Sequence, residues 1–328
     1  MIKVGILGAE TKEAGDLIRL LLHHPEVDLI SVFAPSFRGQ SLSSVHRGLV
    51  GETEMRFSDQ VNLEELDVVF VSRPSSILPL LPPVKELPQD LRVILLDSEK
   101  AGDLPEPFNS REYVPAVSEM FRKPLVRGAS ASRNLPSPVS VALIVLFPLA
   151  LHLLLNDDLK IRVLLPEYQS DAYQVSDMKG MLEDILHSTQ LSFTRIESME
   201  VNSSKAMRAL SVEAEFPCAV SESEIERIYE EMYDDHNFTF LVKTDAQPTE
   251  VAGTQKCLIS ISKPTEGSIR IKGVADAVMR GGAGDAIHAM NLLFGLFEKT
   301  GLSLPAALAY NHEDHEQNIS QTPDDGCK

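Results

Sequence analysis

The feature that most constrains the fold of this chain is a series of short apolar runs in its N-terminal third, each as long as a buried strand. Four segments have this character: KVGILGA (3–9), VDLISVF (27–33), DVVFVS (67–72) and RVILLD (92–97). Leu17, Leu20 and Leu21 have helical spacing and predict a helix between the first two runs. The prolines of 75–88 allow only a short or irregular helix before the last run. Alternating strands and helices predict an α/β domain built on a doubly wound parallel sheet.

After residue 137, the predicted strands and helices no longer alternate regularly. Helices are predicted over 138–155, around 178–187, and from a capping box of Ser221 and Glu224 to Tyr233. The runs FTFLV (238–242), CLISIS (257–262) and SIRIKGV (268–274) are expected to be antiparallel strands. A glycine-rich stretch, GGAGDAIH (281–288), begins a last long helix. We expect an α+β domain whose broad sheet serves as a dimer face.

The net charge of −18 argues against nucleic acid and anionic lipid as partners, because both are bound through positive patches. The apolar stretch 139–155 is interrupted by Ser140, Pro148 and His152 and is shorter than the ~20 residues that span a bilayer. We therefore expect no membrane association. The first residues show no cleavage site of the signal-peptide kind, which favours a cytoplasmic protein.

The cysteines of the chain, Cys218, Cys257 and Cys327, are too few and too scattered for a disulfide framework. They form no CxxC pair, so the sequence predicts no metal site. Reduced thiols are expected, as in most cytosolic proteins.

The turn after the first run, GILGAETKEAG (5–15), is a candidate nucleotide-binding loop, because its glycines would let the backbone approach a pyrophosphate. The positions that would complete a glycine fingerprint hold Thr11 and Ala14. Glu10 and Glu13 would compete with a phosphate for the positive end of the helix. Cofactor contacts in this turn would come from Gly8, Ala9, Thr11 and Lys12. The alternative is a loop that closes a βα unit and binds nothing.

Three stretches carry a family resemblance: residues 5–32, SVHRGLVGETEMRFSD (44–59) and GGAGDAIHAMNLLFGLFEKTGL (281–302). They resemble N-acetyl-gamma-glutamyl-phosphate reductase and, more broadly, the aspartate-semialdehyde dehydrogenase superfamily. The similarity runs from residue 1 to about 310 and is thin between 156 and 205. The resemblance implies an enzyme of amino-acid biosynthesis. Such an enzyme reduces an acyl phosphate to a semialdehyde through a cysteine thioester and hydride from NADPH.

The same resemblance implies a domain order. Residues 1–136 would form a Rossmann-like dinucleotide-binding domain, and residues 137–304 an α+β semialdehyde-dehydrogenase-type dimerisation domain. Residues 305–328 would form a return segment followed by an acidic tail, which we expect to be disordered.

The nucleophile of the family lies in an Asn-Pro-Gly-Cys motif that precedes an apolar helix containing Pro-Leu. Counting back from Pro148 and Leu149 puts Ser137 at the cysteine position, and Asn134 matches the asparagine of the motif. A serine hydroxyl needs an adjacent base, and its oxyester accepts hydride less readily than a thioester. The resemblance therefore implies a site residue, Ser137, that is inactive in the family's chemistry.

Other positions of the family's site also differ. The family's basic histidine corresponds to the region 174–185, where Glu183 keeps a glutamate but no histidine is present. The Ser-Arg pair that holds a 2′-phosphate corresponds to FAPSFRGQS (33–41), in which Ser36 and Arg38 are nearby substitutes. The Lys-Gly near the nicotinamide corresponds to Arg280 and Gly281, of which Gly281 is the candidate cofactor contact.

Together these differences predict a semialdehyde-dehydrogenase-like homodimer that has lost acyl-phosphate reduction. It would act as a binding or partner protein, with a small-molecule ligand between its domains or an active paralogue as its partner. The alternative is an NAD(P)-dependent oxidoreductase that acts on an aldehyde or acyl phosphate by altered chemistry. NADP or NAD is the cofactor that the resemblance implies.

Overall fold

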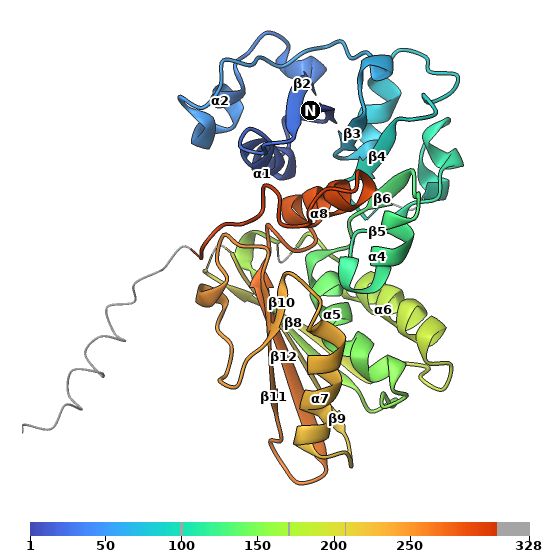
Figure 1. The fold of residues 1–328 in the computed structure, drawn as a ribbon, viewed down its shortest axis with the longest axis vertical. Helices are drawn as coiled ribbons and strands as arrows, with labels where there is room; N and C mark the ends of the chain where they lie inside the picture. The colour runs from blue at the N-terminus through green and yellow to red at the C-terminus, as the bar shows by residue number, and fades with distance from the viewer. Residues whose placement is uncertain (99–100, 170, 207, 307–328) are drawn as a thin grey trace, which may run out of the picture.

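The computed structural model describes residues 1–98, 101–169, 171–206 and 208–306. The predicted acidic tail, from residue 307 onward, lies outside the described residues, and so does Cys327. The chain forms two six-stranded sheets, which lie one above the other along the long axis of the molecule (Figure 1). The helix α8 lies at the level where the two parts meet (Figure 1).

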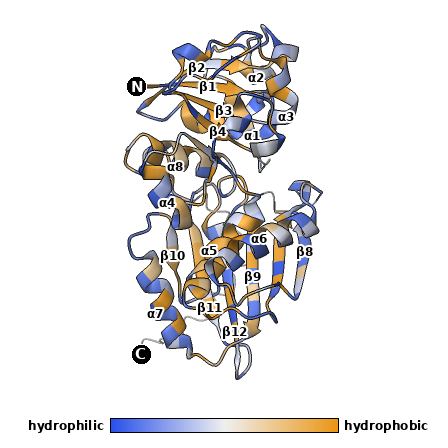
Figure 2. Cartoon of the chain, turned by 90° about the vertical axis from the view of Figure 1, so that its right-hand side faces the viewer, coloured by the Kyte–Doolittle hydropathy of each residue, from blue (hydrophilic) through white to orange (hydrophobic). Residues whose placement is uncertain are grey.

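The first sheet is parallel throughout and has the strand order β2-β1-β3-β4-β6-β5. Its strands are β1 (Ile2–Leu7), β2 (Val27–Phe33), β3 (Val68–Val71), β4 (Arg92–Leu95), β5 (Val114–Pro115) and β6 (Ala131–Arg133). Its helices are α1 (Lys12–Leu21), α2 (Leu42–Val45), α3 (Pro74–Ile77) and α4 (Ser118–Val126). The four predicted runs are β1 to β4, which confirms the Rossmann-like fold. The inner strands β1, β3 and β4 are largely hydrophobic (Figure 2) because both faces of the sheet are covered there, whereas the edge strand β2 leaves Asp28 and Ile30 exposed.

The last helix, α8 (Ala283–Leu293), packs on the first sheet although it follows the second in sequence. Its Ala286, Ile287 and Met290 share one hydrophobic core with Val4 of β1 and Leu17 of α1. The return to the first part of the molecule is thus already made at α8, before the residue 305 expected from the sequence. The helix ends at Leu293, where a left-handed glycine, Gly295, soon follows.

The second sheet has the order β10-β11-β12-β9-β7-β8. Its strands are β7 (Lys160–Pro166), β8 (Ser198–Ser204), β9 (Ala209–Pro217), β10 (Thr239–Leu241), β11 (Cys257–Ser262) and β12 (Ser268–Asp276). The three central pairings are antiparallel, as expected for β11 and β12. The antiparallel prediction for β10 is wrong, because β10 pairs parallel to β11. The connection 242–256 is long enough to return the chain to the starting end of the sheet, as a parallel pairing requires.

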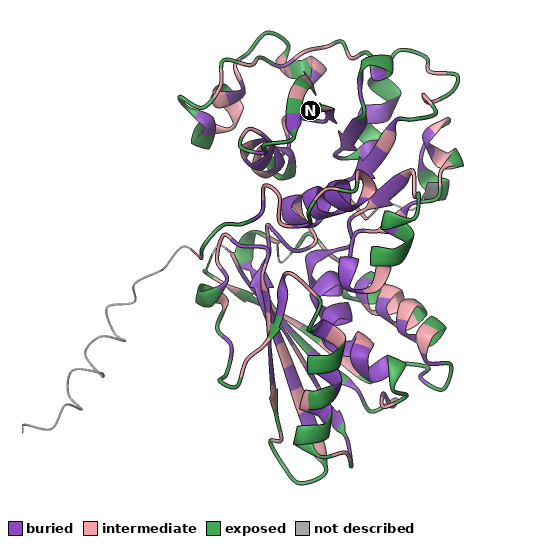
Figure 3. Ribbon diagram, viewed as in Figure 1, coloured by how far each residue is buried: buried purple, intermediate pink, exposed green. Residues whose placement is uncertain are grey.

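One face of the second sheet is covered by α5 (Ser137–Leu151), α6 (Val175–Thr189) and α7 (Glu222–Tyr233). The helix α5 is buried nearly all round, because it lies against β9 and β12 and also contacts α6 and α7 (Figure 3). Ser221 caps α7 by accepting the N–H of Glu224, as its sequence predicted. In the part of the chain that the structure describes, no helix has the length and hydrophobicity of a membrane span.

The helix α5 continues through Pro148, which has no N–H to donate to the carbonyl of Ile144 one turn earlier. The hydroxyl of Tyr233 donates to that carbonyl at 2.5 Å. The hydroxyl of Tyr229 donates to the neighbouring carbonyl of Val145. Burial raises the pKa of both phenols, so both stay protonated as donors.

Replacing these tyrosines by phenylalanine should affect stability unequally. Tyr233→Phe leaves the buried carbonyl of Ile144 without a donor, and we expect the free energy of unfolding to fall by about 1–3 kcal/mol. Tyr229→Phe should cost less, about 0.5–1.5 kcal/mol, because the helix can still supply the N–H of Leu149 to Val145. Urea denaturation of the two variants measures the difference. Equal losses of unfolding free energy in the two variants would contradict the idea that Tyr233 replaces the N–H that Pro148 lacks.

Candidate functional site

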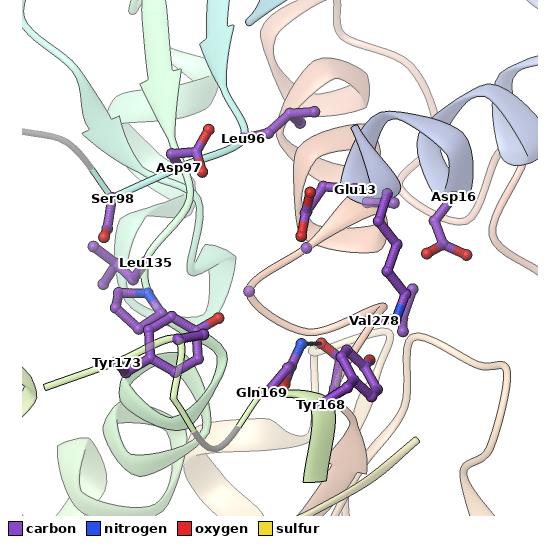
Figure 4. A pocket seen from close by; sticks show the side chains of 17 residues that line it. Glu13, Asp16, Leu96, Asp97, Ser98, Leu135, Tyr168, Gln169, Tyr173 and Val278 are labelled. Atoms are coloured by element: carbon purple, nitrogen blue, oxygen red, sulfur yellow. Dashed lines mark hydrogen bonds between the residues drawn. The ribbon is translucent and has the colours of Figure 1, made fainter. Parts of the chain in front are cut away.

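A pocket of about 290 Å³ lies between the two parts of the molecule (Figure 4). It is lined by the first turns of α1, the chain after β4, the β6–α5 connection, the loop after β7 and residues 277–283. The carboxyl ends of β1, β4 and β6 lead to this pocket, since α1, residue 96 and residue 135 follow these strands. Ligands of open α/β sheets bind outside the carboxyl ends of the strands, so this pocket is the candidate binding site.

Ser137 is the first residue of α5 and lies at the edge of this site, but it does not line the pocket. Only 1% of its surface is exposed. Its hydroxyl makes no hydrogen bond of good geometry within the described residues. Tyr173 does line the pocket (Figure 4), and burial raises the pKa of its phenol while contacts with Ser137 oppose that shift. Ser137 therefore lies behind the pocket wall to which Tyr173 belongs.

Asn134 is fully buried and ties three segments together. Its backbone N–H donates to the carbonyl of Leu95 at 2.9 Å, which extends the pairing of β4 and β6. Its side-chain amide donates to the carbonyl of Gly282 at 2.9 Å and of Leu96 at 3.4 Å. The residue thus fixes the position of the 281–282 turn relative to the first sheet, which is a structural role.

Gly281 lines the pocket at the point where this turn meets Ser137. Its φ of +67° lies in the left-handed region, and a Cβ there would come within 2.4 Å of the Ser137 Cα. The carboxylate of Asp285 accepts its backbone N–H at 2.7 Å. Only glycine allows this close approach, so Gly281 shapes the pocket with its backbone.

Behind the turn, Arg280 is completely buried between two carboxylates. Its guanidinium lies 2.8 Å from Glu119 and 3.4 Å from Asp285. Burial would raise the pKa of Glu119, but the charge of Arg280 and the hydroxyl of Thr239 outweigh it and bring the pKa to about 2. Glu119 is therefore ionised and holds Arg280 in place.

Glu183, the predicted catalytic glutamate, does not line the pocket. Its carboxylate accepts the N–H of Ile196 at 2.7 Å and lies 3.8 Å from Lys179. These contacts join α6 to the chain before β8, so the glutamate has a structural place in this fold.

Neither Cys218 nor Cys257 lines the pocket, and burial raises the pKa of Cys257 to about 12. Among the residues described, no histidine contributes to the pocket wall. The same residues contain no group of histidine, cysteine and acidic side chains suited to a metal ion. The lining therefore offers neither a thiolate nor an imidazole base.

The loop between β1 and α1 holds the predicted cofactor contacts Gly8, Ala9 and Thr11, and Lys12 is the first residue of α1. The Thr11 hydroxyl accepts the N–H of Ala14 at 3.2 Å and donates to the Ser72 hydroxyl at 2.9 Å. One N–H that a bound phosphate would use is thus already satisfied. Of the four residues, only Lys12 lines the pocket.

The glycines of this loop have packing reasons of their own. Gly8 has a φ of +74°, and a Cβ there would come within 2.5 Å of the Ser72 carbonyl oxygen. At Gly15, a Cβ would come within 2.4 Å of the ring of His46. That ring also hydrogen-bonds the carbonyl of Ala9 at 2.7 Å through its Nε2. The glycine pattern is accounted for by this packing, without a ligand.

Ser36 and Arg38 lie away from the pocket, on a short 3₁₀ turn after β2 and just beyond it. Arg38 is exposed and pairs with Asp59 at 2.8 Å. Three carboxylates line the pocket, those of Glu13, Asp16 and Asp97, against the one described basic residue, Lys12. These residues do not fit the phosphates of a dinucleotide, because the acidic side chains repel them.

Sequence reasoning missed Asp16, Asp97, Tyr168 and Tyr173 as pocket residues. A weak signal existed for Asp97, which ends a predicted strand on the side where ligands bind. The tyrosines belong to the stretch where the family resemblance is thin, so no motif marked them.

Known proteins identify the family of the chain. Residues 3–94 match the family model described as semialdehyde dehydrogenase, NAD binding domain. The N-acetyl-gamma-glutamyl-phosphate reductase of Parabacteroides distasonis is 30% identical over 326 residues, covering 93% of this chain and 98% of that protein. The chain belongs to the N-acetyl-gamma-glutamyl-phosphate reductase family. The reductase of Phocaeicola vulgatus is 28% identical, with the same coverage of both chains.

Solved structures share the fold of this family member. Aspartate semialdehyde dehydrogenase with NADP from Candida albicans has a TM-score of 0.62 at 13% identity, covering 90% of this chain and 98% of that chain. A probable aspartate-semialdehyde dehydrogenase from Pseudomonas aeruginosa has a TM-score of 0.61 at 15% identity, with 89% and 98% coverage. The fold inferred from the sequence resemblance is thus confirmed.

The close packing of Gly281 can be tested against a glycine that has similar backbone angles but open surroundings. Gly39 has a φ of +78°, and a Cβ added there would meet no atom within 4 Å. We expect Gly39→Ala to lower the free energy of unfolding by about 1–2 kcal/mol, through backbone strain alone. Gly281→Ala should cost about 1–3 kcal/mol more, because of the contact with Ser137. Similar losses in chemical denaturation would show that the turn is not packed on Ser137.

Proposed function

We propose that this member of the family no longer reduces an acyl phosphate through a thioester, and that its interdomain pocket binds a small molecule. The observation that carries the proposal is Ser137. Its hydroxyl stands at the position expected for the nucleophilic cysteine and is buried behind the pocket wall. A serine in that position would need a general base, and the described lining contains no histidine. The carboxylate of Glu183 accepts the N–H of Ile196 and lies outside the pocket lining, so it does not serve as that base.

A competing function is NAD(P)-dependent reduction of an aldehyde or acyl phosphate without a covalent intermediate. The family's NAD-binding domain favours NADP or NAD as its cofactor. The phenol of Tyr173 favours such a route, because it lines the pocket and stays protonated, as a general acid must. The acidic lining of the pocket argues against this competing function, because its carboxylates would repel the phosphates of the cofactor.

We also propose that the protein is a homodimer. The helices of the second part pack on one face of its six-stranded sheet, and the connection 242–256 covers Val274 on the other face, which leaves the remainder of that face to pair. That face carries Arg162 and Arg270, each 2.9 Å from Glu215, so its charges are largely paired within the chain. Sedimentation equilibrium should give twice the chain mass of 36.1 kDa. A particle with the mass of one chain would refute the dimer.

The loss of thioester chemistry is tested by assaying the purified full chain with N-acetyl-gamma-glutamyl phosphate and NADPH. We expect no substrate-dependent oxidation of NADPH by the wild-type protein or by Ser137→Ala. The variant Ser137→Cys should stay inactive too, because the missing base and the cover by Tyr173 remain. Turnover by the wild type that Ser137→Ala abolishes would overturn the proposal.

Titration with NADPH and NADH, followed by cofactor fluorescence, separates the two functions. No saturation at millimolar dinucleotide supports a binding protein. Saturable binding with NADPH-dependent reduction of an aldehyde, lost in Tyr173→Phe and kept in Ser137→Ala, would establish the competing oxidoreductase instead.

A further inference from the structure

We infer that the pocket binds a small organic cation, an amine or guanidine compound, in place of an anionic acyl phosphate or dinucleotide. This inference rests on the proposed function, in which the pocket is a binding site. It adds the chemical class of the ligand.

The first argument is the charge of the walls. Figure 4 shows Asp97 on one side of the opening and Glu13 and Asp16 on the other. Within the described chain, the carboxylates of Glu13 and Asp16 have no hydrogen bond or ion pair. Burial raises the pKa of Asp16 by more than the nearby positive charges of Arg208, Arg19 and Lys12 lower it, so its charge stays poorly solvated. A bound ammonium or guanidinium would supply the direct hydrogen-bond partner that none of these described cations provides.

The second argument is an internal cation that already occupies an aromatic face of the pocket. The ammonium of Lys12 lies 3.3 Å from the centre of the Tyr168 ring. Both residues line the pocket, so the ring is a surface that holds a positive charge at its wall. A cationic ligand would find the same surface if the flexible Lys12 side chain moved aside.

The third argument is an excess of acceptors. The side-chain oxygen of Gln169 is buried without a hydrogen-bond partner among the described residues, while its amide donates to the carbonyl of Ala277 at 3.4 Å. Together with the carboxylates of Glu13 and Asp16 it favours a ligand that carries several N–H donors, whereas Asp97 already accepts the N–H of Arg73 at 2.6 Å. At about 290 Å³, the pocket is near the lower end of the ~300–1,000 Å³ found for ligand sites, so the ligand has few atoms.

The test uses the full chain and 1,5-diaminopentane as the probe, with binding measured by calorimetry. Pentane-1,5-diol and glutarate are the neutral and anionic controls of equal length, and inorganic pyrophosphate tests for a phosphate site. We expect the diamine to bind and the three controls to fail. Binding should weaken as salt is added, because the attraction is electrostatic.

Variants of the lining residues test whether the diamine is held by negative charges of the pocket. Asp16→Asn and Glu13→Gln should each weaken diamine binding about tenfold or more, as loss of a charged hydrogen-bond partner does. Lys12→Met should strengthen it, because a like charge and the occupant of the Tyr168 ring are removed. Asp28→Asn is the matched control, since Asp28 is exposed on β2 and does not line the pocket. It should bind as the wild type does.

The outcomes separate the two proposals. If the diamine does not bind, or if Asp16→Asn and Glu13→Gln bind it as Asp28→Asn does, the cation inference is overturned and the loss of thioester chemistry is untouched. If pyrophosphate binds to the wild type and binds more weakly to Lys12→Met, the pocket is a phosphate site, and the cation inference is likewise overturned. Thioester turnover in the NADPH assay would instead refute the proposed function, whatever the diamine does.

Discussion

The structure around the pocket depends on one buried charge, the guanidinium of Arg280. Burial alone would lower its pKa, but Glu119 and Asp285 raise it, so it remains a cation without contact with water. Glu119 belongs to α4, Asp285 to α8, and the second sheet contributes Thr239 at 3.4 Å. Removing one partner of such a buried pair costs about 3–5 kcal/mol in other proteins. The interaction therefore joins the two parts of the molecule and holds the turn at Gly281.

The same network limits how the pocket can change. His288 of α8 hydrogen-bonds Ser118 at 3.1 Å and Glu298 at 2.8 Å, and Arg122 pairs with Glu298 at 2.6 Å. These contacts connect α4 and α8 from the interior to the surface. The turn that leads into α8 bounds the pocket, and contacts of Asn134 and Asp285 hold this turn from outside the pocket. A change of ligand can then occur through the lining residues without loss of the fold.

Much of the fold could be predicted from the sequence, and the reasons for the remainder are physical. Strands β1, β3 and β4 are mostly buried on both faces and so read as apolar runs. The edge strand β2 keeps an apolar run although Asp28 and Ile30 are exposed, whereas β5 and β6 have only two and three residues and leave no pattern. The parallel pairing of β10 depends on the path of a loop, which periodicity does not record. At the site, the motifs led to Gly281, which lines the pocket, and to Ser137, which is buried and does not line it. Asp16 could not, because a carboxylate on an amphipathic helix looks like any solvent-facing residue.

The residues that the sequence analysis matched to the family's motifs differ in what they contact. Asn134 and Gly281 hold the backbone, one through the Gly282 carbonyl and the other through its packing on Ser137. Replacing either would disturb the fold, whatever the chemistry of the pocket. Ser137, which the resemblance puts at the cysteine position, is buried at the start of α5 and holds no other segment through its hydroxyl. Sequence similarity in this chain therefore records the requirements of the backbone, and the reaction must be inferred from the side chains that line the pocket.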